Sequence, residues 1–193
     1  ELWLRMADAI KNNIEYSKTV KKIDFTNKIV RTTDGEKYQA DVIITTIPWM
    51  EFDEITGMPE DIKSSIHELK FSSIQTEYFS ENLNTQCQWI YYPDPKLSYH
   101  RILVRHNFCP NSRGYWTETN SERISMEEPN NNFKYMNQYA YPLNTVKKPE
   151  IMKKLLLWSK EKGVIGLGRW GEHQHYNSDV TVDLAMKLTQ ELK

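Results

Sequence analysis

The sequence pattern changes at about residue 72, and this change constrains the fold more than any other feature. From residue 72 to 141 the chain consists of short strand-like segments separated by prolines and asparagines. These segments are 74–79, 89–92, 101–107 and 115–119. Short segments with turn residues between them predict an antiparallel sheet.

The segment before this block has the pattern of an α/β unit. An amphipathic helix is predicted at residues 2–10 and a β-hairpin at 19–33. Residues 40–48 form a continuous apolar run that ends at a proline, which predicts a strand buried on both faces. A short helix is predicted at 59–69, behind an acidic first turn.

The segment after the block returns to the α/β pattern. A helix is predicted at 149–160 and a short buried strand at 164–168. The final helix is expected to begin at Asp179, a good N-cap residue, and to pack a stripe of leucines onto a sheet. The fold class is therefore mixed α/β (α+β), with predicted boundaries at 1–70, 71–147 and 148–193.

The composition shows no bias toward nucleic acid or membrane. Among the 193 residues, 25 Lys and Arg stand against 26 Asp and Glu, so no global positive field attracts nucleic acid or an anionic membrane. No apolar run approaches the roughly 20 residues that a transmembrane helix needs. The two cysteines, Cys87 and Cys109, fit a reducing compartment. We therefore expect a cytoplasmic protein that binds neither nucleic acid nor membrane.

Arginines on a predicted strand are one candidate for an anion site. If residues 101–107 form a strand, then Arg101, Arg105 and Asn107 share one face, because side chains alternate along a strand. Guanidinium groups bind a diphosphate through paired, charge-assisted hydrogen bonds. A solvated strand face is the alternative interpretation.

Arg169 is a second candidate because glycines flank it at the end of a predicted buried strand. The segment Gly168–Arg169–Trp170–Gly171 would allow a ligand to approach the backbone closely. An ordinary turn at the end of the strand is the alternative. His173 and His175 are two residues apart, but no other ligand pair has matching spacing, so we expect no metal site.

Three groups of residues together resemble the UDP-galactopyranose mutases and, more broadly, the FAD-dependent amine-oxidase-like flavoproteins. The first group, similar to the middle of the FAD domain, comprises 2–9, 20–23 and 40–48. The second, similar to the mutase substrate domain, comprises Trp89–Tyr91 with Arg101, Asn107–Phe108, Gly114–Trp116 and Tyr139–Pro142. The third, similar to the mutase motif at the flavin, comprises Gly168–Gly171 and Asp179–Val182.

This resemblance implies part of an FAD-binding Rossmann-like domain, formed by 1–70 and 148–193, and a substrate-binding antiparallel sheet at 71–147. The implied activity interconverts the pyranose and furanose forms of UDP-galactose without net redox change. Reduced FAD would be the nucleophile, so no side chain is expected to be catalytic. A physical argument agrees, because a helix N-terminus favours an anionic reduced flavin.

The resemblance also assigns roles to individual residues. Tyr91, Arg101 and Tyr141 would face the UDP diphosphate, and Arg169 would lie between phosphate and flavin. His175 stands where the family has a tyrosine, and Asn177 matches the eukaryotic branch; both are substrate-binding candidates. The cofactor-binding candidates are Val20, Gly168, Arg169, Asp179, Val180 and Thr181.

The family's dinucleotide fingerprint, its active-site histidine with a glycine loop, and its helical lid have no counterpart in the 193 residues. We therefore expect this chain to be the C-terminal part of a longer enzyme, to require an N-terminal FAD-binding segment as its partner, and to bind FAD weakly alone.

Two other functions remain open. One is an amine-oxidase-like FAD oxidoreductase with an apolar substrate, and the other is a non-catalytic module that binds a nucleotide sugar or a protein.

Overall fold

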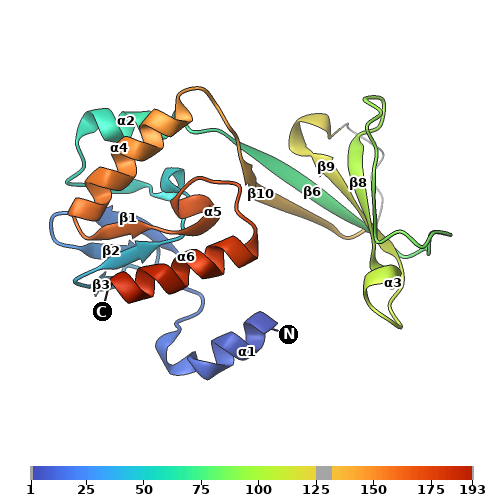
Figure 1. Cartoon of the computed structure of the whole chain (residues 1–193), viewed down its shortest axis with the longest axis horizontal. Helices are drawn as coiled ribbons and strands as arrows, with labels where there is room; N and C mark the ends of the chain where they lie inside the picture. Colours follow the sequence, from blue (N-terminus) through green and yellow to red (C-terminus); the bar gives the residue numbers. More distant parts are fainter. Residues whose placement is uncertain (1, 125–131, 193) are drawn as a thin grey trace. The chain divides into compact units, whose positions relative to one another are not determined.

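The chain leaves its first folded unit after Leu69 and returns to it at Val146. A computed structural model describes residues 2–124 and 132–192 (Figure 1). Unit 1 comprises Glu1–Leu69 and Val146–Lys193, and unit 2 comprises Lys70–Thr145. Unit 1 is mixed α/β and unit 2 is an antiparallel sheet, which confirms the predicted fold class.

Unit 1 contains a four-stranded mixed sheet with the order β3-β2-β1-β5. Its strands are β1 (Val20–Asp24), β2 (Ile29–Thr32), β3 (Lys37–Gln39) and β5 (Glu54–Thr56). The predicted hairpin is confirmed, since β1 and β2 pair antiparallel. The carboxylate of Asp24 accepts hydrogen bonds from the backbone N–H groups of Thr26 and Asn27 and so stabilises the turn between β1 and β2.

A second, two-stranded sheet in unit 1 pairs β4 (Ile43–Thr45) with β11 (Val164–Gly166) in parallel. The prediction of a long strand buried on both faces at 40–48 is wrong. Only three residues of that run are in a strand, and Val42 and Ile44 are 40% and 46% exposed. The backbone enters a turn directly afterwards, because Pro48 cannot donate a strand hydrogen bond and instead precedes η2 (Trp49–Glu51).

All four helices predicted in unit 1 are present, together with two short helices that the sequence did not predict, at Lys11–Asn13 and Gly168–Gly171. They are α1 (Leu2–Ala9), η1 (Lys11–Asn13), α2 (Glu60–Ile66), α4 (Lys148–Glu161), α5 (Gly168–Gly171) and α6 (Ser178–Glu191). Figure 1 shows α2 and α4 side by side over the strands of this unit. Asn177 takes the N-cap position that was predicted for Asp179, so the cap of the last helix lies two residues earlier than expected.

The core of unit 1 is centred on Trp49, which is fully buried. Its indole Nε1 donates to the carbonyl of Gly171 at 2.7 Å, although 122 positions separate the two residues. The ring of Trp49 also stacks near Phe25, with 6.4 Å between the ring centroids. The hydrogen bond from Trp49 to Gly171 joins the two segments of the chain that make up unit 1.

Unit 2 is a five-stranded sheet with the order β10-β6-β9-β8-β7, and its antiparallel pairing confirms the predicted antiparallel block. Its strands are β6 (Phe71–Phe79), β7 (Trp89–Tyr91), β8 (Tyr99–Val104), β9 (Tyr115–Asn120) and β10 (Lys134–Pro142); the short η3 (Ser121–Arg123) follows β9. The sequence pattern did not predict β10, although it is as long as its neighbour β6 (Figure 1). The exposed loop predicted at 127–132 lies outside the described residues except for Asn132.

The prediction that Arg105 and Asn107 continue the Arg101 strand is wrong. The strand ends at Val104, and both residues belong to the short helix α3 (Arg105–Phe108). The side-chain amide of Asn107 donates to the carbonyls of Thr85 at 2.9 Å and Cys87 at 2.8 Å. These side-chain hydrogen bonds favour a turn over a continued strand.

Within the described parts of the chain, no helix combines the length and the apolar character that a membrane span requires.

Candidate functional site

One candidate site is a polar cluster on a face of the antiparallel sheet in unit 2. In the strand register, Arg101 of β8 lies opposite Tyr91 of β7 and opposite Glu118 of β9. Directly paired residues point to the same face of a sheet, so these three side chains lie together. The strand pairing therefore brings together the predicted residues Tyr91 and Arg101.

Arg101 binds Glu118 through two of its nitrogens. Nε and Nη2 donate to Glu118 Oε2 at 2.9 and 2.6 Å, while Nη1 donates to the Tyr91 hydroxyl at 3.3 Å. The guanidinium carbon lies 5.6 Å from the centroid of the Tyr91 ring. Burial lowers the pKa of Arg101, but the hydrogen bonds to Tyr91 and Glu118 outweigh it and raise the pKa overall. Arg101 is therefore a permanent cation held in one orientation.

A β-bulge places His100 beside the same carboxylate. The register of β8 against β9 shifts between Tyr99 and Arg101, and His100 Nε2 lies 3.9 Å from Glu118 Oε2. Burial lowers the pKa of His100, and the neighbouring Arg101 charge acts in the same direction against the attraction of Glu118. His100 is thus mainly neutral at pH 7.

Tyr141, the third predicted diphosphate residue, lies half-buried in β10. It is among the groups whose charge acts on Arg101. In chemical terms, this face offers a cation, aromatic rings and hydroxyl donors, a combination suited to an anionic ligand with an aromatic or sugar part.

Sequence reasoning missed Glu118. Its neighbours Thr117 and Thr119 suggest an ordinary strand, and the carboxylate side chain is 10% exposed. An acidic residue in the middle of a predicted strand is the only signal that the sequence offers. Its pairing with Arg101 depends on the register between two strands and cannot be read from the sequence.

A second candidate site is a cavity of about 550 Å³ within unit 1. It is formed by α1, the residues around α5 and the first turns of α6, and includes Trp3, Met6, Thr46, Leu167, Trp170 and Val182. Three of the predicted cofactor residues, Gly168, Arg169 and Thr181, line it. The structure therefore brings together residues from two motifs that are separate in the sequence.

The geometry at Gly168 and Arg169 shapes one wall of this cavity. Gly168 has φ +74°, and its N–H donates to Glu172 Oε2 at 3.0 Å. A Cβ at position 168 would lie 3.0 Å from Thr181 Cγ2, so glycine allows α5 and α6 to approach closely. Arg169 donates from Nε and Nη2 to the Tyr176 carbonyl at 3.2 and 2.8 Å, which orients its guanidinium.

Burial raises the pKa of two groups around this wall, Glu172 and Tyr176. Burial raises the pKa of Glu172, partly offset by the hydrogen bond from the Gly168 N–H. Burial, followed by the charge of Glu172, also raises the pKa of Tyr176, which remains a neutral phenol at pH 7. The cavity wall thus combines the Arg169 cation with neutral hydroxyl groups and apolar side chains. It can hold a flat apolar ring that carries a polar edge.

The other predicted residues do not line this cavity. Val20 lies in β1, Asp179 and Val180 are exposed, and His175 is exposed on the segment before α6. Asn177 serves as the N-cap, and its carbonyl accepts the backbone N–H and the hydroxyl of Thr181, each at 3.2 Å.

His173 and His175 do not act as a pair. His173 is fully buried and its ring lies 5.7 Å from that of Trp170, whereas His175 is exposed. In residues 2–124 and 132–192, no group of three or more His, Cys, Asp or Glu side chains has the arrangement of a metal site.

No protein-family model matches this sequence, and no curated protein is significantly similar to it. The fold is nevertheless similar to solved structures. Reduced UDP-galactopyranose mutase aligns with a TM-score of 0.67 and 15% identity, over 85% of this chain and 44% of that chain. A fatty acid isomerase from P. acnes that produces CLA aligns with a TM-score of 0.63 and 11% identity, over 90% of this chain and 47% of that one. The chain thus spans about half the length of these structures, and at such identities the similarity concerns the fold alone.

Proposed function

We propose that this chain forms the substrate-binding sheet and part of the FAD-binding fold of a flavin-dependent isomerase that acts on a nucleotide sugar. The similarity of its fold to UDP-galactopyranose mutase supports this proposal, together with the sequence motifs around Arg101 and Arg169. The observation that carries the proposal is the unit 1 cavity, because Gly168, Arg169 and Thr181 meet there from two separate motifs.

The residues of this cavity fit one edge of a flavin. Its volume of about 550 Å³ is within the range of small-molecule sites, and its apolar side chains suit a flat ring. The first turn of α6, a helix of 14 residues, presents Ser178 and Thr181 to the cavity at the positive end of the helix dipole. Arg169 adds a fixed positive charge nearby, which favours a ring that becomes anionic on reduction. FAD in its reduced form would supply the nucleophile of the reaction.

In unit 2, the proposed task of Tyr91 and Arg101 is to bind the diphosphate of the substrate. The Arg101 guanidinium would stabilise the negative charge that develops as UDP departs from the sugar. Tyr91 fixes its orientation through the hydroxyl bond at 3.3 Å. Because Glu118 already binds two of the guanidinium nitrogens, the diphosphate would have to compete with a carboxylate for them.

An assay of the flavin-containing protein that includes this chain tests the proposal. We expect conversion of UDP-galactofuranose to UDP-galactopyranose only after reduction with dithionite. Arg101→Lys should lower kcat/KM about tenfold or more, because lysine cannot form the paired hydrogen bonds of a guanidinium. The matched control is Arg113→Lys. Arg113 is exposed and lies in the loop before β9, outside the Arg101 cluster.

Two results would contradict the proposal. A yellow protein that converts no UDP-galactofuranose in either redox state would exclude the nucleotide-sugar reaction. A colourless protein that binds UDP would indicate a non-catalytic module instead.

A second candidate function is a flavin-dependent oxidoreductase or isomerase with an apolar substrate. One specific observation favours it: Glu118 neutralises Arg101 on the sheet, which lowers the attraction of that face for an anion. The similarity of the fold to a fatty acid isomerase is compatible with it. Turnover of a long-chain fatty acid, with no detectable binding of UDP, would favour this function over the first.

A further inference from the structure

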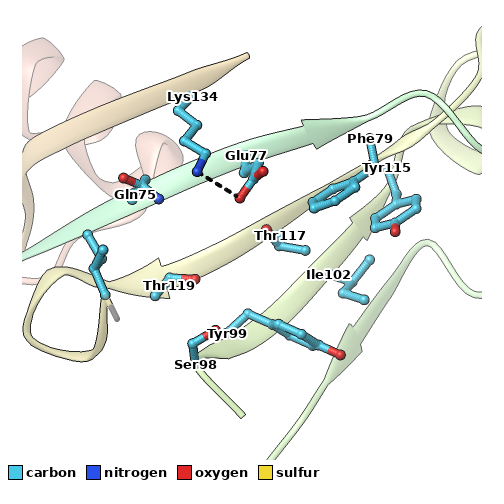
Figure 2. Close-up of a pocket in the computed structure, with 11 residues that line it drawn as sticks. Gln75, Glu77, Phe79, Ser98, Tyr99, Ile102, Tyr115, Thr117, Thr119 and Lys134 are labelled. Carbon is cyan, nitrogen blue, oxygen red and sulfur yellow. Dashed lines mark ion pairs between the residues drawn. The ribbon is translucent and has the colours of Figure 1, made fainter. Parts of the chain in front are cut away.

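The antiparallel sheet of unit 2 has a cavity on the face opposite Arg101. Neighbouring residues of a strand point to opposite faces, so Thr117 and Thr119 lie on the other side of β9 from Glu118. The cavity has a volume of about 300 Å³ and is drawn in Figure 2. Because it lies on the other face of the sheet, its occupancy does not depend on the Arg101 cluster.

Two rows of paired residues form the floor of this cavity. In the first, Thr117 lies between Glu77 of β6 and Ile102 of β8. In the second, Thr119 lies between Gln75 and Tyr99. Figure 2 shows these side chains in successive rows across the sheet. The floor therefore presents a carboxylate, an amide and three hydroxyl groups, with one apolar side chain, Ile102, among them.

The hydroxyl groups of this floor reach the cavity surface, although the two threonines that carry most of it are largely buried as residues. Thr117 is 7% exposed and Thr119 is 9% exposed. Within the described residues, neither threonine hydroxyl forms a side-chain hydrogen bond, nor do the Gln75 amide, the Ser98 hydroxyl or the Tyr99 hydroxyl. Five groups that open into one cavity therefore point to a ligand that can both donate and accept hydrogen bonds.

The charges of the cavity cancel. Glu77, with a side chain that is 10% exposed, accepts from Asn132 Nδ2 at 3.0 Å and lies 3.8 Å from Lys134 Nζ (Figure 2). These are the two formally charged side chains among the described residues that line the cavity, one of each sign. A net charge of zero favours a neutral ligand over a cation or a phosphate.

One end of the cavity is an aromatic wall. Phe79 and Tyr115 pair across β6 and β9, and their rings stack 4.9 Å apart at an angle of 5° (Figure 2). Ile102 extends this apolar surface along the floor. A ligand with an apolar face and a polar rim would satisfy both the wall and the row of hydroxyl groups.

We propose that this cavity binds a neutral polyhydroxylated ring, such as a hexose. Each sugar hydroxyl both donates and accepts a hydrogen bond, which suits Thr117, Thr119 and Gln75. The C–H face of the ring suits the Phe79–Tyr115 wall. The cavity volume of about 300 Å³ lies at the lower end of small-molecule sites and favours a single ring over a nucleotide.

The test is a titration of the isotope-labelled 193-residue chain with D-galactose and D-glucose, followed by NMR. We expect saturable shifts that centre on residues 75–79, 99–102 and 115–119, with affinity in the millimolar range. Thr117→Val and Thr119→Val should each weaken binding about two- to tenfold, the loss of one hydrogen bond. Tyr99→Phe, which removes one hydroxyl and leaves the ring beside Tyr92, should weaken binding as well.

The matched control is Thr76→Val, because Thr76 lies on the same strand β6 but on the Arg101 face. This variant should bind both sugars as the wild type does. The proposal is overturned if neither sugar shifts these residues at high millimolar concentration, or if Thr76→Val weakens binding as much as Thr117→Val. Saturable binding of methylammonium without binding of either sugar would show that the cavity is a cation site at Glu77 instead.

Discussion

Arg101 directs two guanidinium nitrogens at a single oxygen of Glu118, at 2.9 and 2.6 Å, from the neighbouring strand of the same sheet. The two side chains are 22% and 10% exposed. A charge-assisted contact in this geometry is strong because little solvent screens it. The residue that best fits diphosphate binding therefore already has an anionic partner, and the affinity of this face for anions depends on Glu118.

The first prediction concerns this competition. Glu118→Gln removes the negative charge and keeps an acceptor oxygen for Arg101. We expect the affinity of the 193-residue chain for UDP to rise about tenfold, since charge-assisted hydrogen bonds contribute about 1.5–3 kcal/mol. Isothermal titration calorimetry measures the change directly.

The control for this prediction is Glu122→Gln in η3, an exposed residue that does not belong to the Arg101 cluster. It should leave UDP affinity unchanged. If Glu118→Gln binds UDP no better than the wild type, then Arg101 does not bind the diphosphate, and the apolar-substrate function gains support.

The second prediction concerns the cofactor. No glycine-rich dinucleotide fingerprint occurs in the 193 residues, although this turn normally holds the FAD pyrophosphate. Arg169 and the first turn of α6 together contribute roughly 2–4 kcal/mol, whereas millimolar affinity corresponds to about 4 kcal/mol. We therefore expect the isolated chain to be colourless and to bind FAD with a millimolar or weaker Kd. A micromolar Kd in a calorimetric titration would contradict this expectation.

The third prediction tests the contact that joins the two segments of unit 1. Trp49→Phe removes the indole N–H that binds the Gly171 carbonyl at 2.7 Å and leaves a smaller ring in a fully buried position. We expect the free energy of unfolding to fall by about 2–4 kcal/mol. Trp89→Phe is the matched control, because Trp89 is 52% exposed and its loss should change stability by about 0.5 kcal/mol or less. Urea denaturation compares the two, and equal effects would show that the Trp49 contact is not specific.

The fourth prediction is a pH dependence at Glu172. Burial raises the pKa of Glu172 above 4.5 in the folded protein, partly offset by the Gly168 N–H. Between pH 4.5 and this raised pKa, the folded state binds more protons than the unfolded state, so stability falls as pH rises through this window. Glu172→Gln keeps an acceptor for Gly168 but does not titrate.

We therefore expect the stability of Glu172→Gln, relative to the wild type, to increase from below pH 4.5 toward neutrality. Urea midpoints measured across this range test the sign. A difference between the two proteins that stays constant with pH would mean that the fold does not shift the pKa of Glu172.

Local periodicity in the sequence was sufficient to predict much of the fold. The hairpin of β1 and β2, the helices α2 and α4, and the antiparallel character of the sheet in unit 2 were all predicted from it. These features depend on residues that are near in sequence, on turn-forming side chains such as Asp24 and on the spacing of apolar residues. Such signals act within a few residues, so they are visible in the chain itself.

The errors arose where distant segments determine the structure. The apolar run 40–48 was predicted as a buried strand, but only Ile43–Thr45 pairs, with β11, which is more than 100 positions away in the sequence. Arg105 and Asn107 lie in the helix α3 instead of the predicted strand, because the side chain of Asn107 donates hydrogen bonds to the carbonyls of Thr85 and Cys87. Strand formation depends on the neighbouring strand and on side-chain partners as much as on the segment itself.

The candidate sites divide in the same way. The sequence by itself determined the residue types: arginines beside glycines or within a strand, and a hydroxyl-bearing residue at the start of the last helix. Only the tertiary structure decided that Gly168 and Thr181 line one cavity and that Glu118 binds Arg101. It also decided that Thr117 lies on the opposite face of the sheet from Glu118 and Arg101. The reason is physical: a one-residue change of strand register would move every side chain to the opposite face, and register is determined by contacts between strands.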